Sequence, residues 1–326
     1  MAAPEVFAIE QRPLGSSGKT IPRIALGCGN FGGIGSAPAF FGQGLTDDQA
    51  MDLMDAAWAM GITHFDTADA YGGGRSELAI GRWISTRRLR PTITTKTFNP
   101  MADGADHGLD PERIGRQLDS SLDRLGVDHV ELYLAHEYDP DTPVQDTINA
   151  FEGLAAMGEI GAYGVSNFDA AQLEAALQAG RPQAIQNDHS LLERGDEDDV
   201  LPLCAQAGVA YLVFSPLAGG WLTGKYRRDQ PFPAGSRMTQ RPEPYARLLT
   251  DRTFDALDRL DALANERNTS MAGVALAWLL ADDRITQIVI GPGRPEHLQP
   301  VREALQSPLT GDERASLDTI FAPCES

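Results

Sequence analysis

Two hydrophobic patterns alternate along most of the chain. Short apolar runs have the length of buried strands, and the longer segments between them repeat apolar residues every three or four positions, as amphipathic helices do. We expect helices at 46–60, 111–125, 144–157, 170–179 and 200–207. We expect strands that begin at Ile24, Thr63, Thr92, Val130, Ala162, Ala184, Tyr211 and Thr286. Ahead of the first strand, residues 6–21 predict a β-hairpin with its turn at 15–18.

The ends of the predicted helices carry capping residues. Thr46 with Gln49 has the spacing of a capping box, and Asp110 stands before a proline at the first helical position. Strand, helix and glycine therefore recur in a fixed order. The glycines that follow helical segments are Gly61, Gly126, Gly158, Gly180 and Gly208.

This order predicts a barrel of the α/β class. Repeated β-α units give parallel strands with right-handed crossovers, and eight such units close into a (β/α)8 TIM barrel. We expect residues 1–326 to form a single barrel domain that begins with the hairpin. The connection 217–249, rich in Gly, Pro and Arg, interrupts the rhythm after the seventh strand. Its length predicts a loop over the C-terminal face of the barrel, where such folds carry their sites.

Composition and charge limit the kinds of partner. A formal net charge of −19, with no basic block, argues against nucleic acid, although a few local cations can still bind one small phosphate-bearing ligand. Cys28, Cys204 and Cys324 are far apart, and the histidines have no short metal-ligand spacing, so we expect reduced thiols and no metal site. The N-terminus does not resemble a signal peptide, and no apolar run could span a bilayer. We therefore expect a cytoplasmic protein without a membrane partner.

Four polar residues fall where neighbouring strands of the predicted barrel end. Asp66 and Tyr71 close the second strand and its loop, Lys96 ends the third strand, and His136 ends the fourth. Each residue alone is more often a turn, packing or core residue than a functional one. Together, at the C-terminal face, they predict one site for chemistry.

The set suits the reduction of a carbonyl group by hydride, because the alkoxide that develops in a dry site must be protonated. Tyr71 can donate the proton, and a nearby Lys96 would lower its pKa from the usual value of about 10. Asp66 would hold Lys96 in place. His136, neutral beside that cation, would orient the substrate oxygen.

Three sequence segments resemble the aldo-keto reductases. FDTADAYGGGRSE at 65–77 is similar to the family signature, and TTKTF around Lys96 and YLAHEYD around His136 match its other two tetrad positions. The resemblance extends from about residue 23 to about residue 305 and includes the group of potassium-channel beta-subunit-like reductases. It implies an oxidoreductase that interconverts an aldehyde or ketone and its alcohol, with Tyr71 as proton donor and NADP(H) as cofactor.

The same resemblance implies the residues that hold the cofactor. GVSNF and AIQND match segments that bind the nicotinamide carboxamide, VFSPLAGGWLTGKY matches the pyrophosphate loop, and IVIGPGRPEHL matches the adenosine segment. Phe214 stands where the family usually stacks a tyrosine on the nicotinamide ring. The implied cofactor-binding residues are Gly29, Asn30, Phe31, Asp66, Ser166, Asn167, Gln186, Phe214, Ser215, Leu217, Gly219, Gly224, Lys225, Gly291, Gly293, Arg294 and His297.

The choice of cofactor depends on the adenosine end. A guanidinium at Arg294 suits a 2′-phosphate, which favours NADP(H). Glu296 adds a negative charge nearby, and Val301 replaces an asparagine that is common near the adenine, so NAD(H) stays open as the alternative.

Aromatic residues in the strand-end loops predict an apolar or ring-shaped substrate, although they serve equally well to close the barrel mouth. The small-molecule substrate is thus a carbonyl compound or an alcohol. The expected substrate pocket contains Phe31, Phe40, Phe41, Tyr71, His136, Tyr138 and Trp221.

Three other interpretations were weighed. Gly27, Gly29 and Gly32 match the G-x-G-x-x-G dinucleotide fingerprint, but no helix follows directly, so the match is attributed to chance. A barrel hydrolase that pairs Asp66 with Glu137 would leave the tyrosine and lysine unused. A cofactor-binding regulatory subunit with little or no turnover remains the alternative from a different functional class.

Overall fold

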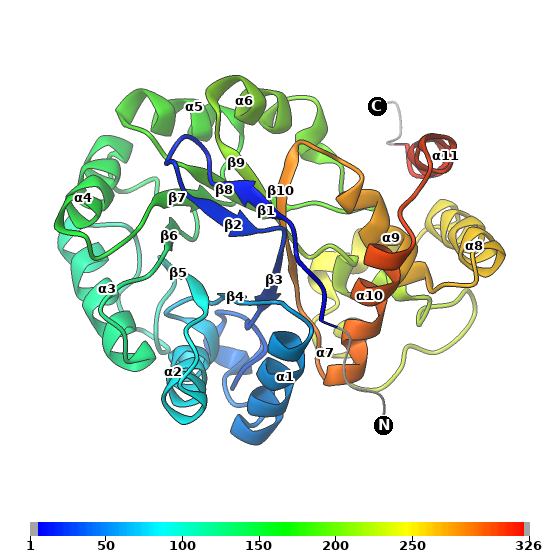
Figure 1. Cartoon of the computed structure of the whole chain (residues 1–326), viewed down its shortest axis with the longest axis horizontal. Coiled ribbons are helices and arrows are strands. Elements are labelled where there is room, and N and C mark those ends of the chain that lie inside the picture. The colour runs from blue at the N-terminus through cyan, green and yellow to red at the C-terminus, as the bar shows by residue number, and fades with distance from the viewer. Residues whose placement is uncertain (1–5, 323–326) are drawn as a thin grey trace.

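The computed structural model describes residues 6–322; residues 1–5 and 323–326, with Cys324, lie outside the description. Eight parallel strands close into a barrel in chain order, with the last strand paired to the first (Figure 1). The predicted (β/α)8 fold is therefore confirmed. The barrel strands are β3 (Ile24–Gly27), β4 (His64–Asp66), β5 (Thr92–Thr97), β6 (Leu132–Ala135), β7 (Tyr163–Ser166), β8 (Ala184–Asp188), β9 (Ala210–Phe214) and β10 (Ile285–Ile290).

Helices surround this barrel (Figure 1). Four of the five helices expected from periodicity have the predicted bounds, and α1 is one residue shorter at each end. None of the described helices is both long and apolar enough to cross a membrane. The helices are α1 (Asp47–Ala59), α2 (Arg75–Arg87), α3 (Pro111–Leu125), α4 (Val144–Met157), α5 (Ala170–Ala179), α6 (Val200–Ala207), α7 (Arg237–Gln240), α8 (Asp251–Glu266), α9 (Met271–Leu280), α10 (Gln299–Gln306) and α11 (Gly311–Ile320).

The capping chemistry explains which helices the sequence predicts well. Thr46 and Gln49 form the expected reciprocal capping box of α1, and Asp110 accepts hydrogen bonds from two backbone N–H groups at the start of α3. In contrast, α2 begins after Gly74, whose backbone is left-handed, and has no side-chain cap. Helix α2 therefore lacked the signal that marked the others.

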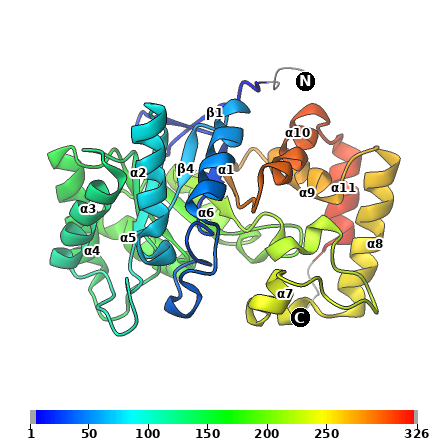
Figure 2. The same cartoon turned by 90° about the horizontal axis from the view of Figure 1, so that it is seen from below.

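The N-terminal hairpin, β1 (Gln11–Pro13) and β2 (Thr20–Pro22), closes one end of the barrel. Leu14 and Ile21 are buried against barrel-lining residues that include Leu134 and Leu212. Figure 2 places β1 and α7 at opposite edges of the molecule. Because the hairpin occupies the N-terminal end, only the C-terminal end is left for a site.

The connection 217–249 is structured rather than a plain loop. It contains η4 (Ala218–Thr223), α7 and η5 (Glu243–Leu248), and it buries Trp221, Tyr226 and Met238 in the main core. Its position past the carboxyl end of β9 agrees with the expected cover over the C-terminal face.

Candidate active site

The ends of β4, β5 and β6 bring four polar side chains together. Asp66 is the last residue of β4, Tyr71 opens η2 (Tyr71–Gly73), Lys96 lies in β5, and His136 follows β6. Lys96 Nζ lies 2.6 Å from Asp66 Oδ1 and 3.5 Å from the Tyr71 hydroxyl. The same hydroxyl lies 3.5 Å from His136 Nε2. The four residues expected from strand register thus form one cluster.

Lys96 is a fully buried cation whose bonds hold it in place. Its ammonium donates to Asp66 and to the Thr67 carbonyl, the latter at 2.9 Å. Burial alone would lower the pKa of Lys96, but the charges of Asp66 and Tyr71 outweigh it and raise the pKa above its usual value. Lys96 is therefore charged at neutral pH.

Asp66 has both carboxylate oxygens engaged. One accepts from Lys96, and the other accepts from Gln186 Nε2 at 2.8 Å. A carboxylate that is satisfied in this way supports a neighbouring cation and is poorly placed to act as an acid or base. The geometry therefore gives no support to a hydrolase that pairs Asp66 with Glu137.

The electrostatics of Tyr71 differ from the expectation. Burial raises the pKa of the Tyr71 phenol, and Lys96 opposes this effect without cancelling it, so the net shift is upward. The cation can be read from the sequence, whereas the desolvation of the ring follows only from the fold. The resulting Tyr71 is a protonated phenol whose phenolate form the lysine makes accessible.

His136 is neutral in this site. Burial, with a further contribution from Lys96, lowers the pKa of the imidazole well below its usual value. Its Nδ1 is buried without a partner among the described residues, while Nε2 faces the Tyr71 hydroxyl. A buried N–H without an acceptor is rarer than a bare ring nitrogen, so we assign the proton to Nε2. His136 can then donate a hydrogen bond toward the cavity.

Buried polar residues fix the loop that carries Tyr71. Asp69 accepts from Thr97 Oγ1 at 2.8 Å and from the Ala70 backbone N–H at 2.6 Å. Ser76 binds the Thr67 hydroxyl at 2.8 Å and donates to a backbone carbonyl of the β3–α1 loop at 3.0 Å. Much of the 65–77 signature therefore positions the tyrosine instead of contacting substrate.

Gly72 allows this loop to pass close to its neighbour. Its φ is +60°, and a Cβ at this position would lie 2.7 Å from the Phe31 carbonyl oxygen. Gly29 lies on the other side of the tyrosine, where a Cβ would come within 3.4 Å of the Tyr71 ring. The glycines of the false dinucleotide fingerprint therefore serve a close approach of loops, and no helix follows them directly.

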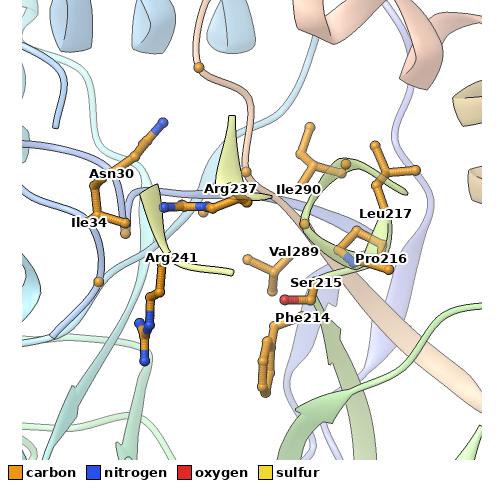
Figure 3. A pocket seen from close by; sticks show the side chains of 18 of the residues that line it. Asn30, Ile34, Phe214, Ser215, Pro216, Leu217, Arg237, Arg241, Val289 and Ile290 are labelled. Atoms are coloured by element: carbon orange, nitrogen blue, oxygen red, sulfur yellow. The ribbon is translucent and has the colours of Figure 1, made fainter. Parts of the chain in front are cut away.

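A cavity of about 1180 Å³ opens at this end of the barrel and includes Tyr71 and His136 in its wall. Figure 3 shows part of its lining, with Phe214 to Leu217 on one side and Asn30 and Ile34 on the other. Most of the expected cofactor positions lie in this wall. Those that line the cavity are Gly29, Asn30, Asp66, Ser166, Asn167, Gln186, Phe214, Ser215, Leu217, Gly219, Lys225, Gly291, Gly293, Arg294 and His297.

The expected aromatic substrate wall needs correction. Phe31 and Trp221 are fully buried in the hydrophobic core and do not line the cavity, which also removes the Phe31 side chain as a cofactor contact. Phe40, Phe41 and Tyr138 are outside the lining as well, as is Gly224. Tyr138 packs edge-on against Phe168, whereas Phe40 and Phe41 are half-buried outside the main core. Sequence position alone does not show which way a ring points.

Polar residues on β7 and β8 extend the cluster. Ser166 Oγ donates to the Gln186 carbonyl at 2.7 Å, and Asn167 Nδ2 donates to the His136 carbonyl at 2.9 Å. Asn167 has a φ of +59°, which is uncommon for a residue other than glycine and is seen at functional sites. The residues expected at the nicotinamide are thus bonded directly to the residues around Tyr71.

Sequence reasoning missed two arginines of the connection 217–249. Arg237 and Arg241 both line the cavity (Figure 3). The segment has no helical or strand periodicity, so nothing in the sequence showed the direction of its side chains. The concentration of arginine in a connection over the active face was the available signal.

The comparisons with known proteins agree with this geometry. A model of the aldo/keto reductase family matches residues 23–322. The chain belongs to the aldo-keto reductase family. Members of this family use nicotinamide cofactors, and the family places the chain among oxidoreductases that interconvert carbonyl compounds and alcohols.

Individual relatives cover nearly the whole chain. An uncharacterized oxidoreductase of Bacillus subtilis is 34% identical and covers 96% of both chains. An NADH-specific methylglyoxal reductase of Escherichia coli is 31% identical over 88% of this chain and 90% of its own. The solved structure of a glycerol dehydrogenase from Gluconobacter oxydans has a TM-score of 0.81 and 27% identity, with 99% and 96% coverage. This aldo-keto reductase therefore matches its relatives over their full barrels.

Proposed function

We propose that this aldo-keto reductase is an NADP(H)-dependent enzyme that interconverts an aldehyde or ketone and the corresponding alcohol, with Tyr71 as proton donor. One observation carries the proposal. The Tyr71 hydroxyl lies 3.5 Å from both Lys96 Nζ and His136 Nε2, at the wall of the large cavity. A carbonyl oxygen at that point would meet a proton donor, a second N–H donor and a stabilising cation.

The residues divide the work of proton transfer. Tyr71 gives its proton to the developing alkoxide, and Lys96 stabilises the phenolate that remains. His136 donates from Nε2 to hold the substrate oxygen, while Asp66 keeps the lysine charged and in place. When bound in this cavity, a reduced nicotinamide would supply the hydride that the carbonyl carbon receives.

The cavity wall fits a dinucleotide. Asn30 Oδ1 is buried without a hydrogen-bond partner among the described residues, as an acceptor for a ligand hydroxyl would be. Phe214 offers a ring for stacking, and Ser215, with a φ of +50°, belongs to a tight turn beside it. We assign the nicotinamide to Phe214 and the diphosphate to the segment 215–219, with Arg237 as its cation between Asn30 and Ile290 (Figure 3).

The preference for NADP(H) depends on Arg294. Its guanidinium is largely exposed, donates from Nε to His297 Nε2 at 3.0 Å and lies 3.7 Å from a carboxylate oxygen of Glu296. This leaves the terminal nitrogens for a 2′-phosphate. One relative is NADH-specific, so the preference of this chain for NADP(H) over NAD(H) has to be measured. The cytoplasmic location also stays a prediction.

The deciding experiment is a fluorescence titration of the purified chain with NADPH and NADH, followed by absorbance assays with aldehydes and ketones. We expect tighter binding of NADPH and loss of its absorbance with some carbonyl compounds. Absence of binding by either cofactor would reject the proposal. Binding without turnover of any carbonyl compound would favour the regulatory-subunit alternative.

A further inference from the structure

Two guanidinium groups in the cavity wall lack a counterion. Arg237 and Arg241 are four residues apart, and neither forms an ion pair or donates a side-chain hydrogen bond within residues 6–322. Arg247, farther along the same segment, is paired with Glu193. Burial lowers the pKa of the Arg237 guanidinium, and the positive charge of Arg241 acts in the same direction. Two unpaired cations that repel each other in one cavity indicate anionic ligands.

The two arginines face different parts of the cavity. Figure 3 shows Arg237 extended between Asn30 and Ile290, and Arg241 pointing away from Arg237. We assigned Arg237 as the cation for the diphosphate at 215–219. Arg241 lies over the Phe40 ring, 5.8 Å from its centroid, and its Nη1 is 3.9 Å from the position of a Cβ on Gly35. The Phe40 ring thus orients the guanidinium by a cation–π contact.

The loop that Arg241 contacts at Gly35 and Phe40 also contacts Tyr71. Gly35 donates its N–H to the Gly29 carbonyl at 2.7 Å and accepts from the Gly72 N–H at 3.2 Å. Gly29 packs against the Tyr71 ring, and Gly72 follows Tyr71 in the chain. Tyr71 and Arg241 therefore contact the same loop and line the same cavity, so a substrate whose carbonyl oxygen lies at Tyr71 and which spans this loop would bring its far end to Arg241.

Acidic residues of the same cavity do not neutralise Arg241. Glu193 is already paired with Arg247. Burial raises the pKa of Glu137 above its usual value, and burial with the charge of Glu193 raises the pKa of Asp188 to about 7. A pKa of about 7 leaves Asp188 only partly charged at neutral pH. Neither Asp188 nor Glu137 forms an ion pair with Arg241 within residues 6–322, so the positive charge of Arg241 is available to a ligand.

We propose that Arg241 recognises an anionic group, a carboxylate or a phosphate, at the end of the substrate remote from the carbonyl. The preferred substrates are then short anionic aldehydes, and Phe40 is a positioning residue for the guanidinium. This inference rests on the proposed function and names its substrate class. It replaces the apolar or ring-shaped substrate that the aromatic residues had suggested.

Matched substrate pairs test the charge directly. Glyceraldehyde 3-phosphate is compared with glyceraldehyde, and succinic semialdehyde with butanal, by NADPH oxidation. We expect the wild-type enzyme to prefer the charged member of at least one pair. Arg241→Gln should raise KM for that charged member about ten- to a hundredfold, with little change in kcat and none for the neutral member. The pair that responds identifies phosphate or carboxylate as the recognised group.

Three variants separate recognition from general damage. Arg241→Lys keeps the charge without the planar fork and should restore part of the affinity. Phe40→Leu removes the ring under the guanidinium and should raise the same KM by a smaller factor. Arg82→Gln, at an exposed ion pair on α2, should leave both pairs of substrates unchanged. Thermal unfolding midpoints check that each variant is folded.

A binding measurement keeps the inference independent of turnover. Calorimetry with the NADP⁺-loaded protein measures the affinity for succinate and for glycerol 3-phosphate, with and without Arg241→Gln. Loss of anion binding in the variant supports the inference. Equal binding to both proteins, or a weaker NADPH affinity in the variant with unchanged substrate KM, overturns it. If the wild type binds these anions through Arg241 but oxidises NADPH with no aldehyde, the proposed function fails and the anion site stands.

Discussion

The Lys96 ammonium lies 3.5 Å from the Tyr71 hydroxyl; Lys96 is fully buried, and Tyr71 is half-buried in the wall of the cavity. Burial favours the neutral phenol, whereas the adjacent cation favours the phenolate. These opposing effects leave the pKa of Tyr71 above its usual value, with Lys96 limiting the increase. In its proposed role as proton donor, Tyr71 would hold its proton until an alkoxide forms, and the phenolate that remains would still be stabilised by Lys96.

Replacement of the proposed proton donor should separate chemistry from binding. Tyr71→Phe keeps the ring that packs beside Gly29 and removes only the acid. We expect kcat to fall by about a hundredfold or more, with the Kd for NADPH within about twofold of the wild type. Stopped-flow absorbance and a fluorescence titration measure the two quantities. Full turnover in this variant would show that another group supplies the proton.

Removal of the lysine should change the pH profile of alcohol oxidation, which requires the phenolate. In Lys96→Met the cation that lowers the Tyr71 pKa is absent, so this pKa rises. The increase of kcat with pH, which follows formation of the phenolate, should therefore move to higher pH by about 1 unit or more. The pH dependence of kcat measures this shift. Lys96→Arg keeps the charge and serves as the control. An unchanged pH profile in Lys96→Met would show that the charge of the lysine does not set the pKa of Tyr71.

His64 should make the fold sensitive to acid. Burial lowers the pKa of His64 from 6.5 to about 3, and its ring contacts Thr94 and Gln287. The His64 imidazole therefore binds a proton more tightly in the unfolded chain than in the folded chain. The stability present above the unfolded-state pKa of 6.5 is lost as the pH falls toward the folded-state pKa of about 3. Between about pH 7 and about pH 5 this group should cost about 2 kcal/mol.

Urea unfolding of wild type and His64→Gln at both pH values measures this cost. The variant should lose less stability on acidification by about the same 2 kcal/mol, whatever its absolute stability. His129→Gln alters a histidine near the surface and should keep the wild-type pH dependence. An identical loss in wild type and His64→Gln would contradict the assignment.

A methyl group on Gly72 should disturb the active site. A Cβ there would lie 2.7 Å from the Phe31 carbonyl, in addition to the strain of a left-handed backbone. Gly72→Ala should therefore cost about 1–3 kcal/mol of stability and reduce kcat. Gly104→Ala is the matched control, because Gly104 has a φ of +71° with no atom near the added methyl. If Gly72→Ala and Gly104→Ala lower stability equally, the loss comes from backbone strain alone and not from the contact with the Phe31 carbonyl.

The cofactor preference should depend on one side chain at the adenosine end. Arg294→Gln should weaken NADPH binding about tenfold and leave NADH binding unchanged, because only NADPH has a 2′-phosphate to lose its partner. Fluorescence titration gives both Kd values. An equal loss of affinity for NADPH and NADH would show that Arg294 contacts a part of the cofactor other than the 2′-phosphate. Tighter binding of NADH than of NADPH by the wild type would contradict the predicted preference.

The sequence predicted best those features that depend on residues close together in the chain. The periodicity of α3 to α6 and their capping residues gave the helix bounds, because short-range hydrogen bonds and amphipathic faces decide them. Strand register at the C-terminal face was sufficient to predict that Asp66, Tyr71, Lys96 and His136 come together. Helix α2 was not predicted, because it begins after three glycines and has no side-chain cap.

Other features depend on contacts between distant segments, which only the tertiary structure decided. The pKa of Tyr71 rises because desolvation of the ring outweighs the charge of Lys96, and burial cannot be read from spacing. Phe31 and Trp221 turn into the core, where aromatic area is best buried, and Arg241 rests on Phe40 from a segment about 200 residues away. The order of residues thus determined the barrel and the convergence of Asp66, Tyr71, Lys96 and His136, whereas long-range packing determined their protonation and placed Arg237 and Arg241 in the cavity wall.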